Sequence, residues 1–126
     1  MNHKEPEINK DSFRLRPLEE RRKKYESLLK KSADSIPIVF EADSKTDLPM
    51  NLKLSAKKGL KFSKIVENYR SNGKIEPSKS IFFYSETSKT ISHNLTIDEI
   101  YSKYKNKEDN FLYIKCAEVE ALGCDY

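Results

Sequence analysis

The sequence predicts an α+β fold in which a mixed four-stranded sheet packs on a helix. Four short runs rich in β-branched and aromatic residues alternate with stretches whose apolar residues recur at helical spacing. Their order along the chain is helix, strand, strand, helix, strand, short helix, strand. A strand pair, a crossing helix and two later strands indicate the β-grasp arrangement. An ordinary α+β sandwich is the alternative that the pattern leaves open.

Length and composition fit one domain with a heavily charged surface. The 126 residues include seven Tyr and six Phe to fill an interior, while 35% of all residues are charged. The net charge of +4 is modest, and its densest run, residues 21–24 (RRKK), is typical of a solvated helix face. On charge alone, the alternative is that this run forms a binding patch for acidic peptides, anionic lipid or nucleic acid. No apolar run long enough for a membrane span and no secretory signal occur, so we expect a cytoplasmic protein with reduced cysteines.

The N-terminal part is predicted to be a polar arm followed by an amphipathic helix. Residues 1–10 carry almost no apolar side chains, which predicts a flexible arm. Residues 11–33 are predicted to form a helical subdomain. Its helix runs from Pro17 to about Lys31, with acidic residues in the first turn and lysines in the last. Four apolar residues fall on one face of this helix: Leu18, Tyr25, Leu28 and Leu29.

Two strand-like runs follow the helix. Residues 36–40 (IPIVF) are β-branched and aromatic, and Pro37 suits a strand start or a position that needs no ladder donor. Residues 50–54 (MNLKL) alternate apolar and polar side chains, as a half-buried strand does. The turn-rich residues 43–49 separate the two runs, so we expect a hairpin.

The C-terminal half is predicted to hold two helices and two strands. A helix is expected after Gly59, with an apolar face that contains Phe62, Ile65, Val66 and Tyr69. Residues 71–73 (SNG) are expected to end it. Residues 81–84 (IFFY) read as a strand, followed by a polar loop. Thr96 and Glu99 form a capping box ahead of a short helix. Residues 111–114 (FLYI) are the last predicted strand, with a tail from about Ala117.

Five segments, in this order and spacing, carry a family resemblance: residues 17–22 (PLEERR), 36–41 (IPIVFE), 80–84 (SIFFY), 100–101 (IY) and 110–114 (NFLYI). Together they resemble the autophagy ubiquitin-like modifiers, which include the GABA-receptor-associated protein and the light chain of microtubule-associated proteins. The resemblance extends from about Ser12 to Gly123. It implies a ubiquitin-like β-grasp domain over residues 34–123 that carries an N-terminal helical extension.

The resemblance also implies a role for Gly123, which lies nine residues after Ile114, at the family's spacing between last strand and terminal glycine. A dedicated cysteine protease would cleave between Gly123 and Cys124 and remove residues 124–126. Activating and conjugating enzymes would then join the freed carboxylate to phosphatidylethanolamine, placing the protein on autophagosomal membranes. Glycine suits this chemistry because it lacks a Cβ and can thread a narrow channel. Without the upstream match, Gly123 would read as one more residue of a flexible tail.

A second implied function is the capture of peptides in which an aliphatic residue follows an aromatic one by three positions. The peptide would pair with the exposed edge of the second strand, where Lys53 would attract flanking acidic residues. The resemblance assigns six residues to the aromatic pocket: Lys24, Leu28, Pro37, Val39, Leu54 and Phe111. It assigns Leu60 and Ile65 to the second, aliphatic pocket. Core packing of the apolar members and solvation of the lysines are the alternative readings.

Three positions depart from the family pattern. Ser35 stands where an arginine is common, Asn68 where an apolar residue is expected, and Leu122 where an aromatic residue usually precedes the glycine. These departures predict a divergent member, either with a changed range of partners or with a groove that has lapsed.

Catalysis is not expected from this chain. Outside the tail, candidate catalytic side chains reduce to His3, His93 and Cys116, and a cysteine on a strand is typically a small buried hydrophobe. No phosphate-binding loop or zinc cluster occurs, so we expect no cofactor, no metal and no nucleic-acid partner. The rival function is a non-conjugated β-grasp interaction module that binds acidic peptides or anionic surfaces.

Overall fold

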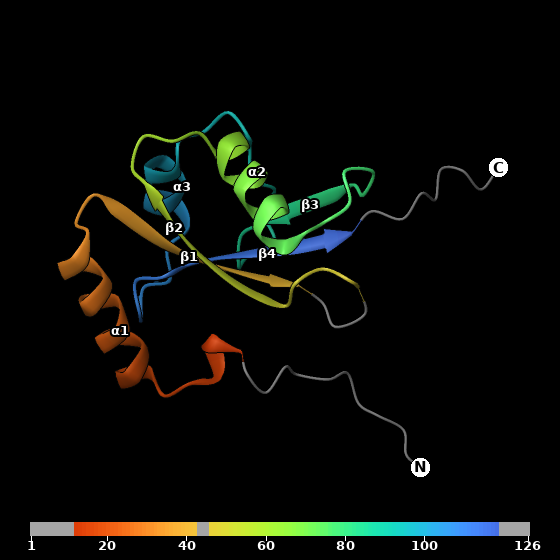
Figure 1. The fold of residues 1–126 in the computed structure, drawn as a ribbon. Helices are drawn as coiled ribbons and strands as arrows, with labels where there is room; N and C mark the ends of the chain where they lie inside the picture. Colours follow the sequence, from red (N-terminus) through yellow and green to blue (C-terminus); the bar gives the residue numbers. More distant parts are fainter. Residues whose placement is uncertain (1–11, 43–45, 119–126) are drawn as a thin grey trace, which may run out of the picture.

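The computed structural model describes residues 12–42 and 46–118 (Figure 1). Along the chain the elements are η1 (Phe13–Leu15), α1 (Leu18–Lys31), β1 (Ser35–Ala42), β2 (Asn51–Lys57), α2 (Phe62–Gly73), β3 (Ile81–Tyr84), α3 (Ile97–Tyr104) and β4 (Leu112–Glu118). This order confirms the predicted alternation of helices and strands. The short 3-10 helix η1 is an addition to it.

The four strands form one mixed sheet in the order β2-β1-β4-β3. β1 pairs antiparallel with β2 and parallel with β4, and β3 pairs antiparallel with β4. Pro37 immediately precedes Ile38, the residue at which the pairing with β4 begins. The missing N–H of Pro37 is therefore placed near the start of the strand, as the sequence predicted.

Successive side chains of a strand point to opposite faces of the sheet, and different helices cover the two faces (Figure 1). On one face, Ile36, Ile38 and Phe40 pack with the buried side of α2 and with α3 in the main core. On the other face, a smaller cluster contains Phe13, Val39, Phe111 and Tyr113, and Tyr25 and Leu28 of α1 pack against it. The sheet thus lies between α2 and α3 on one side and the N-terminal segment on the other.

The helices on the main core begin and end where their sequences require. All four predicted apolar residues of α2 are buried, and the helix stops at Lys74, whose φ of 53° is left-handed. Gly73 is needed for packing, because a Cβ there would come within 2.8 Å of the Pro49 ring. The capping box of α3 is formed as predicted, with the Glu99 N–H donating to Thr96 and the Thr96 N–H donating to Glu99.

Two expectations about these elements were wrong. Leu29 does not share the buried face of α1, because its side chain is 41% exposed. The tail does not begin near Ala117, because β4 continues to Glu118 by pairing with Ile81–Phe83. The extra length of β4 comes from this partner strand, and the Glu118 carboxylate also accepts a 2.8 Å hydrogen bond from Lys79.

Candidate functional site

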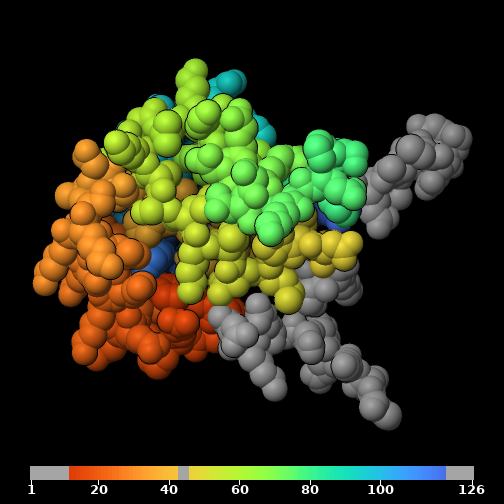
Figure 2. Space-filling view, in the orientation of Figure 1, coloured from red at the N-terminus to blue at the C-terminus, as the bar shows by residue number. Residues whose placement is uncertain are grey.

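An apolar hollow of about 210 Å³ lies between α1 and the edge strand β2. In Figure 2, blue atoms from the C-terminal part of the chain show between the orange helix α1 and the yellow-green strand β2. Ten residues line this α1–β2 hollow: Phe13, Lys24, Leu28, Pro37, Ile38, Val39, Lys53, Leu54, Ser55 and Phe111. The structure therefore brings together the six residues assigned to the aromatic pocket and also Lys53.

Leu54 was assigned to the aromatic pocket, but Ser55 is the residue that shares the α1 face of β2 with Lys53. Leu54 lies opposite Ile38 in the β1–β2 register, and its side chain packs against the main core on the α2 face. Ser55 lies opposite Pro37, and Lys53 lies opposite Val39, so these two β2 side chains share the α1 face of the sheet. Leu54 thus borders the hollow without supplying its side-chain wall. The period-two alternation around Lys53 could have identified Ser55.

Leu60 and Ile65, the two residues assigned to a second pocket, lie on the α2 side of the sheet. Ile65 is 1% exposed in the main core, and Leu60 is partly buried against the same core. Neither residue lines the α1–β2 hollow. Phe13 is the main lining residue that the sequence interpretation missed, and its only signal was that it is the first aromatic residue after the polar arm.

Aromatic rings and cations surround the hollow. The Phe13 and Phe111 rings lie 4.6 Å apart, centroid to centroid, in an edge-on arrangement. The Lys53 ammonium is 5.1 Å and the Arg16 guanidinium carbon 5.5 Å from the Phe13 ring centroid. Burial, followed by the positive charges of Arg16 and Lys24, lowers the pKa of Lys53. The site can therefore receive an apolar group and attract an anion beside it.

The edge of β2 adds main-chain recognition to this hollow. β2 is an outer strand of the sheet, with β1 as its partner on one side. The unpaired N–H and C=O groups of such an edge can add a strand from another chain. The hollow and the strand edge are adjacent, so one extended peptide could use both.

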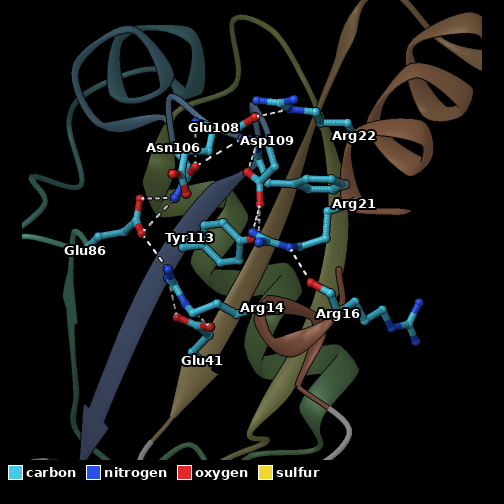
Figure 3. A network of polar contacts seen from close by, with 11 residues as sticks. Arg14, Arg16, Arg21, Arg22, Glu41, Glu86, Asn106, Glu108, Asp109 and Tyr113 are labelled. Atoms are coloured by element: carbon cyan, nitrogen blue, oxygen red, sulfur yellow. Dashed lines mark hydrogen bonds and ion pairs between the residues drawn. The ribbon is translucent and has the colours of Figure 1, made fainter. Parts of the chain in front are cut away.

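Polar contacts fasten the N-terminal segment to the sheet (Figure 3). Arg14 donates to the Glu41 carboxylate of β1 at 2.9 and 3.0 Å and to Glu86 at 2.8 Å. Arg22 donates to the backbone carbonyl of Glu108 at 2.8 Å. These contacts matter because α1 contains no buried residue, so apolar burial alone holds it weakly.

The second part of this network centres on the buried carboxylate of Asp109. It accepts hydrogen bonds from Arg21 Nη1 at 2.6 Å, from the Tyr113 hydroxyl, and from the Phe111 N–H at 2.9 Å. Burial, reinforced by the Asp109 carboxylate, raises the pKa of Tyr113, which keeps its hydroxyl protonated as a donor. Asp109 is 0% exposed, so these partners stand in for the water that its carboxylate would otherwise bind.

Gly123 and Cys124, predicted as the conjugation and cleavage sites, lie outside the described residues. Within residues 12–42 and 46–118, no group of three His, Cys, Asp or Glu side chains could hold a metal ion. In the same residues, no helix has the length and apolar character needed to cross a membrane.

A mixed sheet in the order β2-β1-β4-β3, crossed on one face by a helix, defines a ubiquitin-like fold. The family model described as "Autophagy protein Atg8 ubiquitin like" matches residues 20–123. The chain therefore belongs to the Atg8 family of autophagy ubiquitin-like proteins.

Two relatives support this membership, and one solved structure shares the fold. Autophagy-related protein 8A of Oryza sativa is 32% identical over 115 residues, which cover 89% of this chain and 95% of the relative. Autophagy-related protein 8 of Dictyostelium discoideum is 30% identical over 112 residues, with coverage of 86% and 90%. The crystal structure of Trypanosoma brucei ATG8 shares the fold, with a TM-score of 0.75 at 23% identity and coverage of 88% and 96%.

Proposed function

We propose that this protein is a ubiquitin-like modifier that is trimmed to Gly123 and joined through that residue to phosphatidylethanolamine. The observation that carries the proposal is the family match, which ends at Gly123. The Gly123–Cys124 bond would be cleaved by a trimming cysteine protease. Activating and conjugating enzymes of the autophagy pathway would then transfer the freed carboxylate to the lipid amine. The protein would be cytoplasmic before conjugation and bound to autophagosomal membranes afterwards.

The proposed second role is recruitment of receptors or adaptors through the α1–β2 hollow. It is supported by the apolar lining, by the cations Arg16, Lys24 and Lys53 at the hollow, and by the adjacent edge of β2. A receptor peptide would place an aromatic side chain in the hollow and add a strand to β2. Acidic residues beside the aromatic residue would meet the cations.

Intact-mass analysis of the protein purified from its own cells under starvation tests the conjugation. We expect loss of residues 124–126 together with the added mass of a phospholipid, and neither change in a Gly123→Ala variant. A wild-type protein that keeps residues 124–126 and gains no lipid mass would contradict this part of the proposal.

The rival candidate, a non-conjugated interaction module, predicts the same groove without the mass change. Peptide titration tests the groove separately. We expect Ser55→Trp to fill the hollow and abolish binding of an acidic peptide containing Trp-x-x-Leu. Lys57→Trp is the matched control, because Lys57 is on the same face of β2 but outside the hollow. Equal loss in both variants, or in neither, would exclude the hollow as the peptide site.

A further inference from the structure

We propose that Asp109 is the positioning residue of the α1–β2 hollow, because its buried carboxylate binds both the helix that forms one wall and the backbone of the aromatic residue that forms another. This inference rests on the proposed peptide-binding function and names a residue outside the lining of the hollow. A peptide would not touch Asp109, which is 0% exposed.

The first contact fixes the helical wall. Arg21 belongs to α1, one turn before Lys24 and two turns before Leu28, which line the hollow. Its Nη1 donates to Asp109 Oδ2 at 2.6 Å, and its Nε donates to the Arg16 carbonyl at 2.9 Å. Since α1 has no buried residue, this charge-assisted bond is a large part of what sets the distance from α1 to the sheet.

The second contact fixes the aromatic wall. Asp109 Oδ1 accepts the N–H of Phe111 at 2.9 Å, two residues along the chain, which closes an Asx turn. Asn110, between them, has a left-handed φ of 67°. The Asx turn favours this backbone conformation, which directs the Phe111 ring toward Phe13 and the hollow.

A third contact joins the two walls to β4. The Tyr113 hydroxyl donates to the same oxygen, Oδ2, that accepts from Arg21. Figure 3 shows Arg21 and Tyr113 meeting at this carboxylate. One carboxylate therefore links α1, the turn before β4, and β4 itself, and replacing it with a neutral group would weaken this link between α1 and the other two.

Two measurements test this inference on the full chain. The first is the affinity for the acidic Trp-x-x-Leu peptide, measured by calorimetry. The second is the nuclear Overhauser contact between the rings of Tyr25 and Phe111, whose centroids are 5.9 Å apart where α1 packs beside the hollow. The ring contact needs no peptide, so it reports the spacing of the walls by itself.

We expect Asp109→Asn to weaken peptide binding about tenfold and to weaken the ring contact, because the amide keeps the size of the side chain but loses the charge that binds Arg21. Arg21→Met is expected to do the same from the other side of the pair, and it decides the question if Asp109→Asn does not fold. Glu67→Gln is the control, because it makes the same carboxylate-to-amide change at an exposed position of α2, on the other face of the sheet, and should change affinity less than about twofold.

The outcomes separate the two proposals. If wild type binds the peptide and both Asp109→Asn and Arg21→Met bind it with the same affinity, Asp109 has no positioning role. The proposed groove would still stand. A wild-type protein that binds no such peptide would contradict the proposed groove, and the ring contact would then decide alone whether Asp109 sets the spacing of the walls.

Discussion

The guanidinium of Arg14 lies over the ring of Tyr113, with its Cζ 4.0 Å from the ring centroid. In this position its nitrogens reach both Glu41 and Glu86. One side chain thereby links the segment before α1 to β1 and to the loop after β3. The N-terminal segment is held here mainly by charge and by aromatic contact.

Arg14→Met is therefore expected to lower the free energy of unfolding by about 1–2 kcal/mol, because it leaves two carboxylates without their shared counter-ion. Urea unfolding measures this change. Arg14→Lys keeps the charge but cannot bind both carboxylates with a planar fork, so its free energy of unfolding should lie between those of wild type and Arg14→Met. A midpoint for Arg14→Met equal to that of wild type would show that the network contributes nothing to stability.

The capping box of α3 gives a second stability prediction. Thr96→Ala should cost about 1 kcal/mol, because the Glu99 N–H loses its acceptor at the start of an eight-residue helix. Chemical denaturation checks the value. Thr90→Ala is a matched control, since Thr90 is exposed and outside the helix. A similar loss in both variants would mean that the effect does not come from the cap.

Cys116 predicts a pH dependence of stability. Burial raises the pKa of its thiol to about 12, so the folded protein keeps the proton at pH values where the unfolded chain has lost it. The unfolded state then binds fewer protons, and the free energy of unfolding falls as pH rises above the ordinary thiol pKa. The limiting slope for one thiol is about 1.4 kcal/mol per pH unit.

Unfolding free energies of wild type and Cys116→Ala at pH 8, 9 and 10 test this sign. Other groups titrate in both proteins, so the difference between the two curves isolates Cys116. Wild type should lose stability faster with rising pH than the alanine variant does. Parallel curves would show that the Cys116 thiol has no raised pKa in the folded state.

Lys53 gives a prediction about binding kinetics. If acidic peptides bind at the α1–β2 hollow, Lys53→Met should slow their association and make the affinity less sensitive to salt, because a steering charge is removed. Stopped-flow measurements at two ionic strengths would show both effects. Lys89→Met, an exposed lysine that does not line the hollow, serves as the control. Unchanged salt dependence in Lys53→Met would contradict a role for this ammonium in attracting the partner.

The sequence predicted the fold well because its elements are locally consistent. The buried face of α2 and the capping box at Thr96 follow from spacing alone, and both are present. The end of β4 was not predictable in this way. Ala117 and Glu118 belong to a strand because β3 lies beside them, and that neighbour comes from a distant part of the chain.

The α1–β2 hollow was predicted less completely than the fold. A resemblance could transfer Lys24, Val39 and Phe111, which the structure brings together. It placed Leu54 beside Lys53 in one pocket, although neighbouring side chains of a strand point to opposite faces and Ser55 is the residue on the face of Lys53. Asp109 was also missed, since nothing in the local sequence shows that Arg21 reaches it across 88 positions.

The end of β4 limits the distance between the sheet and a lipid that would be joined at Gly123. Four residues lie between Glu118, the last residue of β4, and Gly123. Even fully extended, the chain from Glu118 to Gly123 spans only about 17 Å, which is less than the hydrocarbon thickness of a bilayer. A lipid joined at Gly123 would thus hold the end of β4 within this distance of the point of attachment, close to the headgroups.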